Sequence, residues 1–300
     1  MTSVCLAVHS QPNSEVLKPY VTTCLSQCMT VLRTDNEENA LVALRIIFDL
    51  HKNFRPDLEK EVQPFLDFVK SIYQSLPATV EEALNAAATA AGAAATQAGA
   101  NGAGAAAVVA PGTPVALAGV GGASNSASAA GAGAAETKAA ATPAKLLRST
   151  GSFKVLTECP LITMLLFQLY PRYFNPNMVA LVPLMMNALQ LQANPAAATA
   201  VRGRFTEFLA CQVKTLSFLT YLLRGSFESM KPYESAIAKC VIRLLKVCPD
   251  EAVGTRKEIL VATRHILATD FRKAFFPHVD VFLDESILIG RGRQAHDVSA

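Results

Sequence analysis

The sequence predicts an all-α protein, an α-solenoid of HEAT-like antiparallel helical hairpins interrupted by an Ala/Gly-rich insert. Large apolar residues recur every three to four positions over most of the chain, and no segment shows sustained strand alternation between turn signals. The segment Phe54–Leu58 is echoed by Phe174–Met178. When the insert is left out, these two similar segments are separated in sequence by roughly the length of one HEAT-type repeat.

Residues 37–76 are the clearest hairpin. Asp35 or Asn36 is placed to cap the first helix, and Arg55-Pro56-Asp57 is expected to end it and start the second, because the residue before proline avoids helical angles. Both helices present an apolar face that must be buried. The residues of these faces are Ala40, Leu41, Leu44, Ile47 and Phe48, then Leu58, Val62, Phe65, Leu66, Val69, Ile72, Tyr73 and Leu76.

An N-terminal helical unit over residues 1–77 also holds a helix at 16–32, the second helix of a preceding hairpin. Residues 78–148 consist mainly of Ala, Gly and Ser without periodicity, which predicts a disordered loop because nothing offsets the chain entropy. A phosphate-binding loop at Gly119–Gly122 is disfavoured, since no strand precedes it and no Lys-Ser/Thr pair follows it.

Residues 149–290 return to helical periodicity, and residues 291–300 are expected to form a divergent, disordered tail. A shorter loop is predicted at Ala193–Val201, and Asp270 is a candidate cap. The helices predicted in this second unit are Ser152–Pro171, Asn177–Gln192, Phe205–Arg224, Lys231–Cys248, Thr255–Ala268 and Phe271–Leu283.

Composition excludes several classes of protein. A net charge of +3 over 300 residues does not predict nucleic-acid binding. The start of the chain lacks the pattern of a secretory signal, so a reducing intracellular compartment is expected for the seven cysteines. The apolar segments Val155–Tyr170 and Met178–Leu191 are shorter than the roughly 20 residues that span a membrane, which favours buried helices.

No catalytic, cofactor or metal site is predicted. Cys24 with Cys28, and Cys240 with Cys248, offer only pairs of ligands where structural zinc needs four, so packing in the core is favoured. His51 is expected to be a boundary histidine. His265, His278 and Asp280 have no serine or cysteine that the sequence places beside them.

A group of basic residues in the last third of the chain could align along stacked helices. A solvated face is favoured over a weak site for an acidic partner, and direct DNA contact is the least favoured alternative. These residues are Arg256, Lys257, Arg264, Arg272 and Lys273.

Several segments together resemble the N-terminal HEAT region of one family, that of the transformation/transcription domain-associated protein (TRRAP), a pseudokinase scaffold related to the phosphatidylinositol-3-kinase-like kinases. They occur here in the order of the family and cover most of the chain outside the insert and the ends. The segments are Leu41–Leu76, Ser152–Leu156, Phe167–Tyr170, Val182–Asn187, Val213–Tyr221, Arg256–Leu260, His265–Leu267 and Phe282–Gly290.

The resemblance implies a non-catalytic scaffold segment in the nucleus, without cofactors or a small-molecule substrate. Its implied partners are the subunits of SAGA-type and NuA-type histone acetyltransferase complexes and acidic transcription activators, and the residues that bind them stay unknown. The insert is simpler than the family's own loop, and the chain departs from the family after Gly290. These departures lead us to expect a fragment, a truncated gene model or a splice product.

Two alternatives come from other classes. A stand-alone HEAT-type adaptor could bind other proteins or a nucleic acid, and salt-dependent binding to DNA or RNA would favour that reading. A kinase of the related family is disfavoured, because the sequence has no glycine-rich nucleotide loop with its lysine, no HRD-like catalytic loop and no DFG.

Overall fold

The computed structural model describes residues 15–55, 57–90 and 148–290. Within these ranges the regular secondary structure is helical, with one isolated β-bridge between Asn36 and Arg148. The all-α prediction is therefore confirmed. Residues 91–147 of the predicted loop, which include Gly119–Gly122, and the tail 291–300 lie outside the described part, so what is expected of them stays a prediction.

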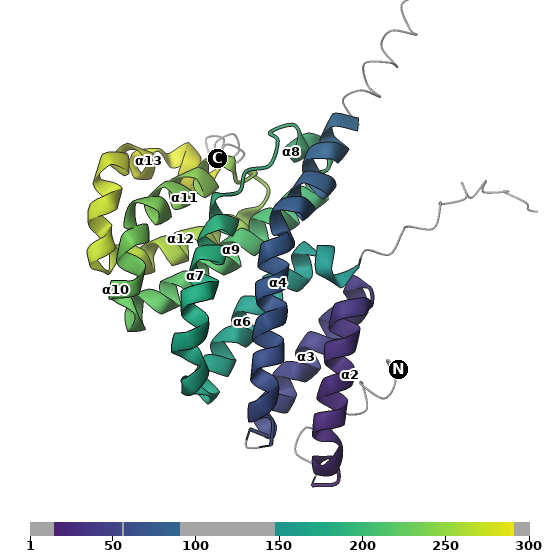
Figure 1. The fold of residues 1–300 in the computed structure, drawn as a ribbon. Helices are drawn as coiled ribbons and strands as arrows, with labels where there is room; N and C mark the ends of the chain where they lie inside the picture. Colours follow the sequence, from purple (N-terminus) through teal and green to yellow (C-terminus); the bar gives the residue numbers. More distant parts are fainter. Residues whose placement is uncertain (1–14, 56, 91–147, 291–300) are drawn as a thin grey trace, which may run out of the picture. The chain divides into compact units, whose positions relative to one another are not determined.

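The helices pack in two layers (Figure 1). Within each layer, every helix packs against the next helix of the same layer. The first layer consists of α3 (Glu37–Asn53), α6 (Phe153–Leu169), α9 (Arg202–Gly225) and α12 (Val253–Leu267). The second consists of α4 (Val62–Val80), α7 (Phe174–Gln190) and α11 (Glu234–Val247).

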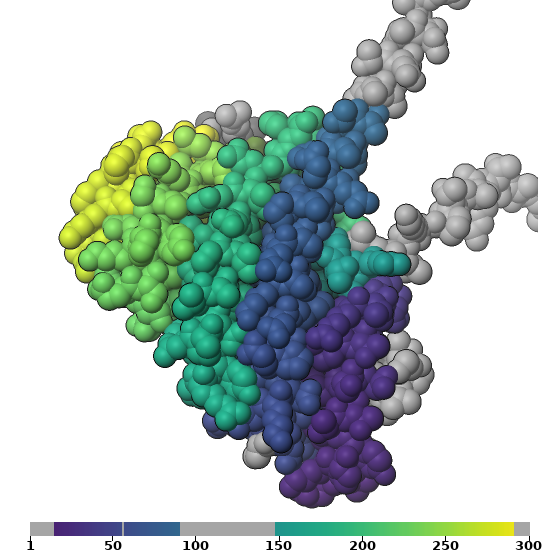
Figure 2. All heavy atoms as spheres, viewed as in Figure 1, coloured from purple at the N-terminus to yellow at the C-terminus, as the bar shows by residue number. Residues whose placement is uncertain are grey.

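This alternation is the stacking expected of HEAT-like hairpins. Consecutive helices fall into different layers, and successive hairpins lie side by side in chain order (Figure 2). Helix α2 (Val21–Thr34) packs on α3. Each repeat covers the apolar face of its neighbour, so one continuous core runs through the described helices.

Two of the first-layer helices, α3 and α6, begin with a side-chain cap, and the cap of α3 at Asn36 is one of the two that the sequence predicts. The Asn36 side chain accepts a hydrogen bond of 3.0 Å from the Asn39 backbone N–H at the start of α3. Ser152 accepts one of 3.1 Å from the Val155 N–H at the start of α6. Each cap satisfies one of the backbone donors that have no partner inside a helix.

The predicted boundary of the insert at residue 78 is wrong. Helix α4 continues into a π-helical turn, η3 (Glu81–Ala86), and residues 87–90 are also helical. Val80, Leu84 and Ala88 are buried and extend the apolar stripe at intervals of four residues. Because alanine and glutamate are strong helix formers, this stretch forms helix despite its simple composition.

Ser149, which follows the insert, is hydrogen-bonded to the end of α2. The Ser149 hydroxyl donates to the Leu32 carbonyl at 2.7 Å, and the Ser149 N–H donates to the Asp35 carbonyl at 3.1 Å. The helices before and after the insert are therefore joined by hydrogen bonds as well as by the core.

The second hairpin helix starts later than predicted. After Phe54 ends α3, a short 3₁₀ turn, η2 (Glu59–Glu61), precedes α4, and the N-cap position Glu61 makes no side-chain cap bond. The predicted loop at Ala193–Val201 contains one short helix, α8 (Ala197–Ala200).

The last predicted helix, Phe271–Leu283, is divided. It comprises a 3₁₀ helix, η7 (Asp270–His278), and α13 (Val279–Leu283). The cap is Thr269, whose hydroxyl accepts from the Phe271 N–H at 3.3 Å, so the candidate Asp270 cap was wrong. Two short helices complete the described part, α10 (Phe227–Met230) and α14 (Glu285–Ile289).

A search of the described helices for membrane spans finds no single helix that is both long and apolar enough to cross a bilayer. One pair, Phe153–Leu169 with Pro171–Gln190, meets the length and composition criteria only jointly, and it is bent by 118°.

Candidate functional site

The cysteines singled out as ligand pairs lie mostly in the core, as predicted. Cys28, Cys240 and Cys248 are buried, and Cys24 is half-buried. Burial raises the pKa of the Cys240 and Cys248 thiols. A hydrogen bond with the Cys28 side chain lowers the pKa of Cys24 to about 7. Among the described residues no group of three or more His, Cys, Asp or Glu side chains is arranged to hold a metal ion.

His51 is buried in the core, which corrects the expectation of a boundary histidine. Its Nδ1 lies 3.2 Å from the Tyr170 hydroxyl, which itself donates to the Arg55 carbonyl at 2.8 Å. The Tyr170 oxygen therefore accepts from Nδ1–H, and Nε2 has no partner among the described residues. Burial lowers the pKa of His51 to about 4, so the ring is neutral at pH 7.

The remaining candidate histidines lie on separate elements. His265 on α12 accepts a hydrogen bond at Nδ1 from the Arg224 guanidinium on α9, at 3.1 Å. His278 is the last residue of η7, and Asp280 is exposed on α13.

Arg256 does not belong to the exposed basic group. Only 4% of its surface is exposed, and its guanidinium donates to the carbonyls of Cys248, at 2.6 Å, and of Ile287. It also lies 3.4 Å from the Asp250 carboxylate. Arg256 thus satisfies a carbonyl just past the end of α11 and holds α14 in place. The other four basic residues, Lys257, Arg264, Arg272 and Lys273, are exposed.

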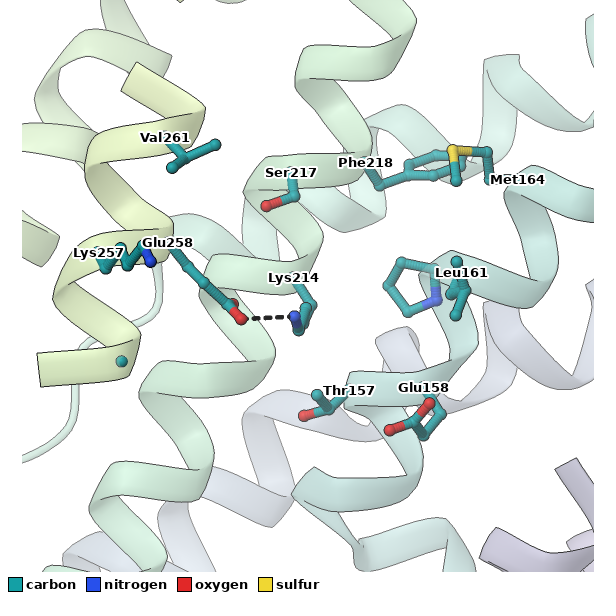
Figure 3. A pocket seen from close by; sticks show the side chains of 12 residues that line it. Thr157, Glu158, Leu161, Met164, Lys214, Ser217, Phe218, Lys257, Glu258 and Val261 are labelled. Atoms are coloured by element: carbon teal, nitrogen blue, oxygen red, sulfur yellow. Dashed lines mark hydrogen bonds and ion pairs between the residues drawn. The ribbon is translucent and has the colours of Figure 1, made fainter. Parts of the chain in front are cut away.

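A groove lies on the first layer, and the sequence did not predict it. Figure 3 shows α6 forming one wall, α12 the opposite wall and α9 the floor. Its volume is about 650 Å³. Its lining side chains include Glu158, Leu161 and Met164 from α6, Lys214, Ser217 and Phe218 from α9, and Lys257, Glu258 and Val261 from α12.

Two smaller hollows extend this α6–α9–α12 groove. One, of about 210 Å³, lies between α3 and α6 and shares Glu158 and Leu161 with the groove. The other, of about 270 Å³, lies between α9 and α12 and shares Ser217 and Val261. The three hollows therefore lie next to one another across the first layer from α3 to α12.

The walls of the groove expose apolar surface. Leu161 on α6 is 50% exposed and Val261 on α12 is 42% exposed. On the floor, the Lys214 ammonium and the Glu258 carboxylate form an ion pair of 2.8 Å. The groove is suited to binding apolar side chains, and no nucleophile and base are paired in it.

Comparison with known proteins identifies the family. Residues 204–299 match the family model described as the Tra1 HEAT repeat central region. Over 95% of its length, the chain is 40% identical to a probable transcription-associated protein 1 of Dictyostelium discoideum. Over 97% of its length, the chain is 35% identical to the human transformation/transcription domain-associated protein. The chain belongs to the TRRAP/Tra1 family.

The family resemblance read from the sequence is thereby confirmed, and the matched model places residues 204–299 in the central rather than the N-terminal HEAT region. The chain spans about 7% of the length of the two relatives just named. In this TRRAP/Tra1 segment, α9 and α12 of the groove lie within the matched model. Helix α6 lies outside it.

A charge network joins the starts of three first-layer helices of this segment. Glu37 accepts from the Ser152 hydroxyl at 2.6 Å and pairs with Lys154 at 2.8 Å. Lys154 and Arg204 also reach Glu207, at 3.3 and 3.1 Å. Partial burial raises the pKa of Glu37, but the hydrogen bonds from Lys154 and Ser152 outweigh it and hold the pKa below its usual value. The network links α3, α6 and α9.

Proposed function

We propose that this chain is a non-catalytic scaffold segment of a nuclear transcription coactivator, within histone acetyltransferase complexes of the SAGA and NuA4 type. The supporting observation is the alignment of nearly the whole chain with the family. Two further relatives, from Schizosaccharomyces pombe and Saccharomyces cerevisiae, are named SAGA complex/NuA4 acetyltransferase complex subunits, and the chain is 31% and 27% identical to them.

The stacked architecture supports a role in binding other proteins. In a solenoid each repeat contacts only its neighbours, which leaves extended surfaces on both layers for partners. Two polar pairs lie in the groove and in the neighbouring hollow between α9 and α12, Lys214–Glu258 and Arg224–His265, and neither joins a nucleophile to a base. Such an arrangement favours binding over catalysis.

We propose two classes of partner. The first is other subunits of the acetyltransferase complexes. The second is acidic activation segments, which would be attracted to the exposed basic residues Lys257, Arg264, Arg272 and Lys273 by long-range electrostatics.

Affinity purification of the tagged chain from its source cells, followed by quantitative mass spectrometry, tests this proposal. We expect acetyltransferase-complex subunits to be enriched over an untagged extract, and to be lost with Phe153→Asp, which places a charge in the core. Recovery of the chain alone would contradict the proposal. So would recovery only with nucleic acid that nuclease treatment removes, which would favour the adaptor alternative.

A further inference from the structure

The exposed apolar residues of the α6–α9–α12 groove face each other across a hollow. Leu161 projects from the α6 wall and Val261 stands on the α12 wall, and Met164 and Phe218 also line the groove (Figure 3). Removing apolar surface from water favours the formation of a complex. A ligand with two or three large apolar side chains along one line would cover this surface.

The two walls carry charges of opposite sign. Glu158 on α6 is exposed and takes part in none of the described ion pairs, and the same holds for Lys257 on α12. Between them the Lys214–Glu258 pair crosses the floor without adding net charge. Apart from that pair, the α6 wall carries one acidic group and the α12 wall one basic group.

This charge pattern distinguishes between partners. An all-acidic segment would approach Lys257 favourably, but it would also meet Glu158 on the opposite wall. Like charges placed together at an interface weaken binding and exclude wrong partners. A ligand with basic residues on one flank and acidic residues on the other would meet complementary charge on both walls.

The form of the groove favours a helix as the ligand. The described residues offer no sheet edge to which an extended strand could add. An open apolar groove between helices suits an amphipathic helix whose anchors are spaced at i, i+3 or i+4, and i+7. The neighbouring hollows, one between α3 and α6 and one between α9 and α12, offer such a helix further contact surface.

We propose that the groove binds an amphipathic helix of mixed charge from a partner protein, with its basic flank toward Glu158 and its acidic flank toward Lys257. This inference rests on the proposed scaffold function and deepens it, because it assigns the groove to a helix of another subunit rather than to an acidic activation segment.

Fluorescence anisotropy with the full chain and labelled peptides tests the assignment. The first probe is a helical peptide of about four turns with Leu at i, i+4 and i+7, Lys and Arg on one flank and Glu on the other. The second keeps the apolar positions and carries only acidic flanks, and the third is a scrambled form of the first. We expect the first to bind with a Kd of roughly 1–100 µM and the others at least about tenfold more weakly.

Variants of the chain locate the binding. Leu161→Asn or Val261→Asn should weaken the mixed-charge peptide about tenfold or more, whereas Val179→Asn, at an 80% exposed position on the second layer, should leave it unchanged. Glu158→Lys should reverse the preference toward the acidic peptide. Circular dichroism checks that each variant stays folded.

Three results would overturn the inference: no binding of the mixed-charge peptide, equal or tighter binding of the acidic peptide by the unmodified chain, or binding that the groove variants leave unchanged. Each of these would leave the scaffold proposal standing, because that proposal is decided by which proteins purify with the tagged chain.

Discussion

Tyr73 on α4 and Thr215 on α9 share a buried hydrogen bond of 2.8 Å that joins the two layers. Because the Thr215 hydroxyl donates to the Cys211 carbonyl at 2.8 Å, its oxygen accepts from Tyr73. Tyr73 precedes the insert and Thr215 follows it. The hydrogen bond therefore helps to hold the solenoid together across the interruption.

Thr215→Val should destabilise the chain more than Tyr73→Phe. The valine leaves the buried Tyr73 hydroxyl without an acceptor, which costs about 1–3 kcal/mol, whereas the phenylalanine removes one hydrogen bond worth about 1 kcal/mol. Urea unfolding followed by circular dichroism measures the difference. Tyr20→Phe, at a residue that is 63% exposed, is the control that should change nothing. Equal losses for both core variants would contradict this account.

The burial of His51 should make stability depend on pH. Its pKa is about 4 in the folded chain and about 6.5 when unfolded, so the unfolded state binds the proton more readily. Stability should therefore fall by up to about 3 kcal/mol as the pH is lowered from 6.5 to 4. His51→Leu should flatten this dependence, whereas Tyr170→Phe, which keeps His51 buried, should retain it. A slope unchanged in His51→Leu would show that other groups cause it.

Glu37 should matter in a lower pH range. Its folded pKa lies below its usual value, so its contribution is present above about pH 4.3, the unfolded value, and is lost as the pH falls through the folded pKa. Glu37→Gln should cost about 1–2 kcal/mol at pH 7, since it weakens hydrogen bonds to charged groups. Glu38→Gln is the matched control: it removes a charge from the same turn at an exposed position. Equal costs for the two variants, measured by urea unfolding, would assign the effect to the helix dipole alone.

Arg256 should hold the C-terminal end of the described part. Arg256→Met removes the donors to the Cys248 and Ile287 carbonyls, and we expect a loss of about 2–4 kcal/mol. Faster hydrogen exchange over Glu285–Ile289 would show the release of α14. Lys257→Met, at the exposed neighbouring position, should leave exchange there unchanged. Unaltered exchange in Arg256→Met would mean that α14 is held by other contacts.

Limited proteolysis should test the revised boundary of the insert. Val80, Leu84 and Ala88 are buried, so residues 78–90 should resist a protease of broad specificity, and we propose that the first cuts fall between residues 91 and 147. Mass spectrometry of the fragments locates them. First cuts within residues 78–90 would support the original boundary.

The sequence predicted most of the fold because large apolar side chains mark buried helix faces. The stripe of α4, for example, is buried as expected at Val62, Phe65, Leu66, Val69, Ile72, Tyr73 and Leu76. Residues 78–90 were assigned to the insert because alanine does not distinguish a buried helix face from an exposed one. Val80 and Leu84 nevertheless continue the four-residue spacing of the apolar stripe. Arg256 was wrongly grouped with exposed basic residues. A guanidinium can be buried when it donates to backbone carbonyls, and the spacing of apolar residues in the sequence does not show where those carbonyls lie.

The groove could not be predicted in the same way. Leu161 and Val261 are apolar residues on helices that also bury other apolar residues, so the sequence alone does not tell an exposed one from a core one. Their exposure depends on how α6, α9 and α12 are spaced, which follows from packing among residues far apart in the chain.

The most direct test of the central claim is sedimentation of source-cell extract on a gradient. Each fraction is assayed for histone acetyltransferase activity and probed by denaturing immunoblot with an antibody against residues 206–224. Denaturation is needed because this part of α9 is largely buried. We predict that the immunoblot signal coincides with acetyltransferase activity in fast-sedimenting fractions. A signal confined to slow fractions without that activity would contradict the assignment as a scaffold segment.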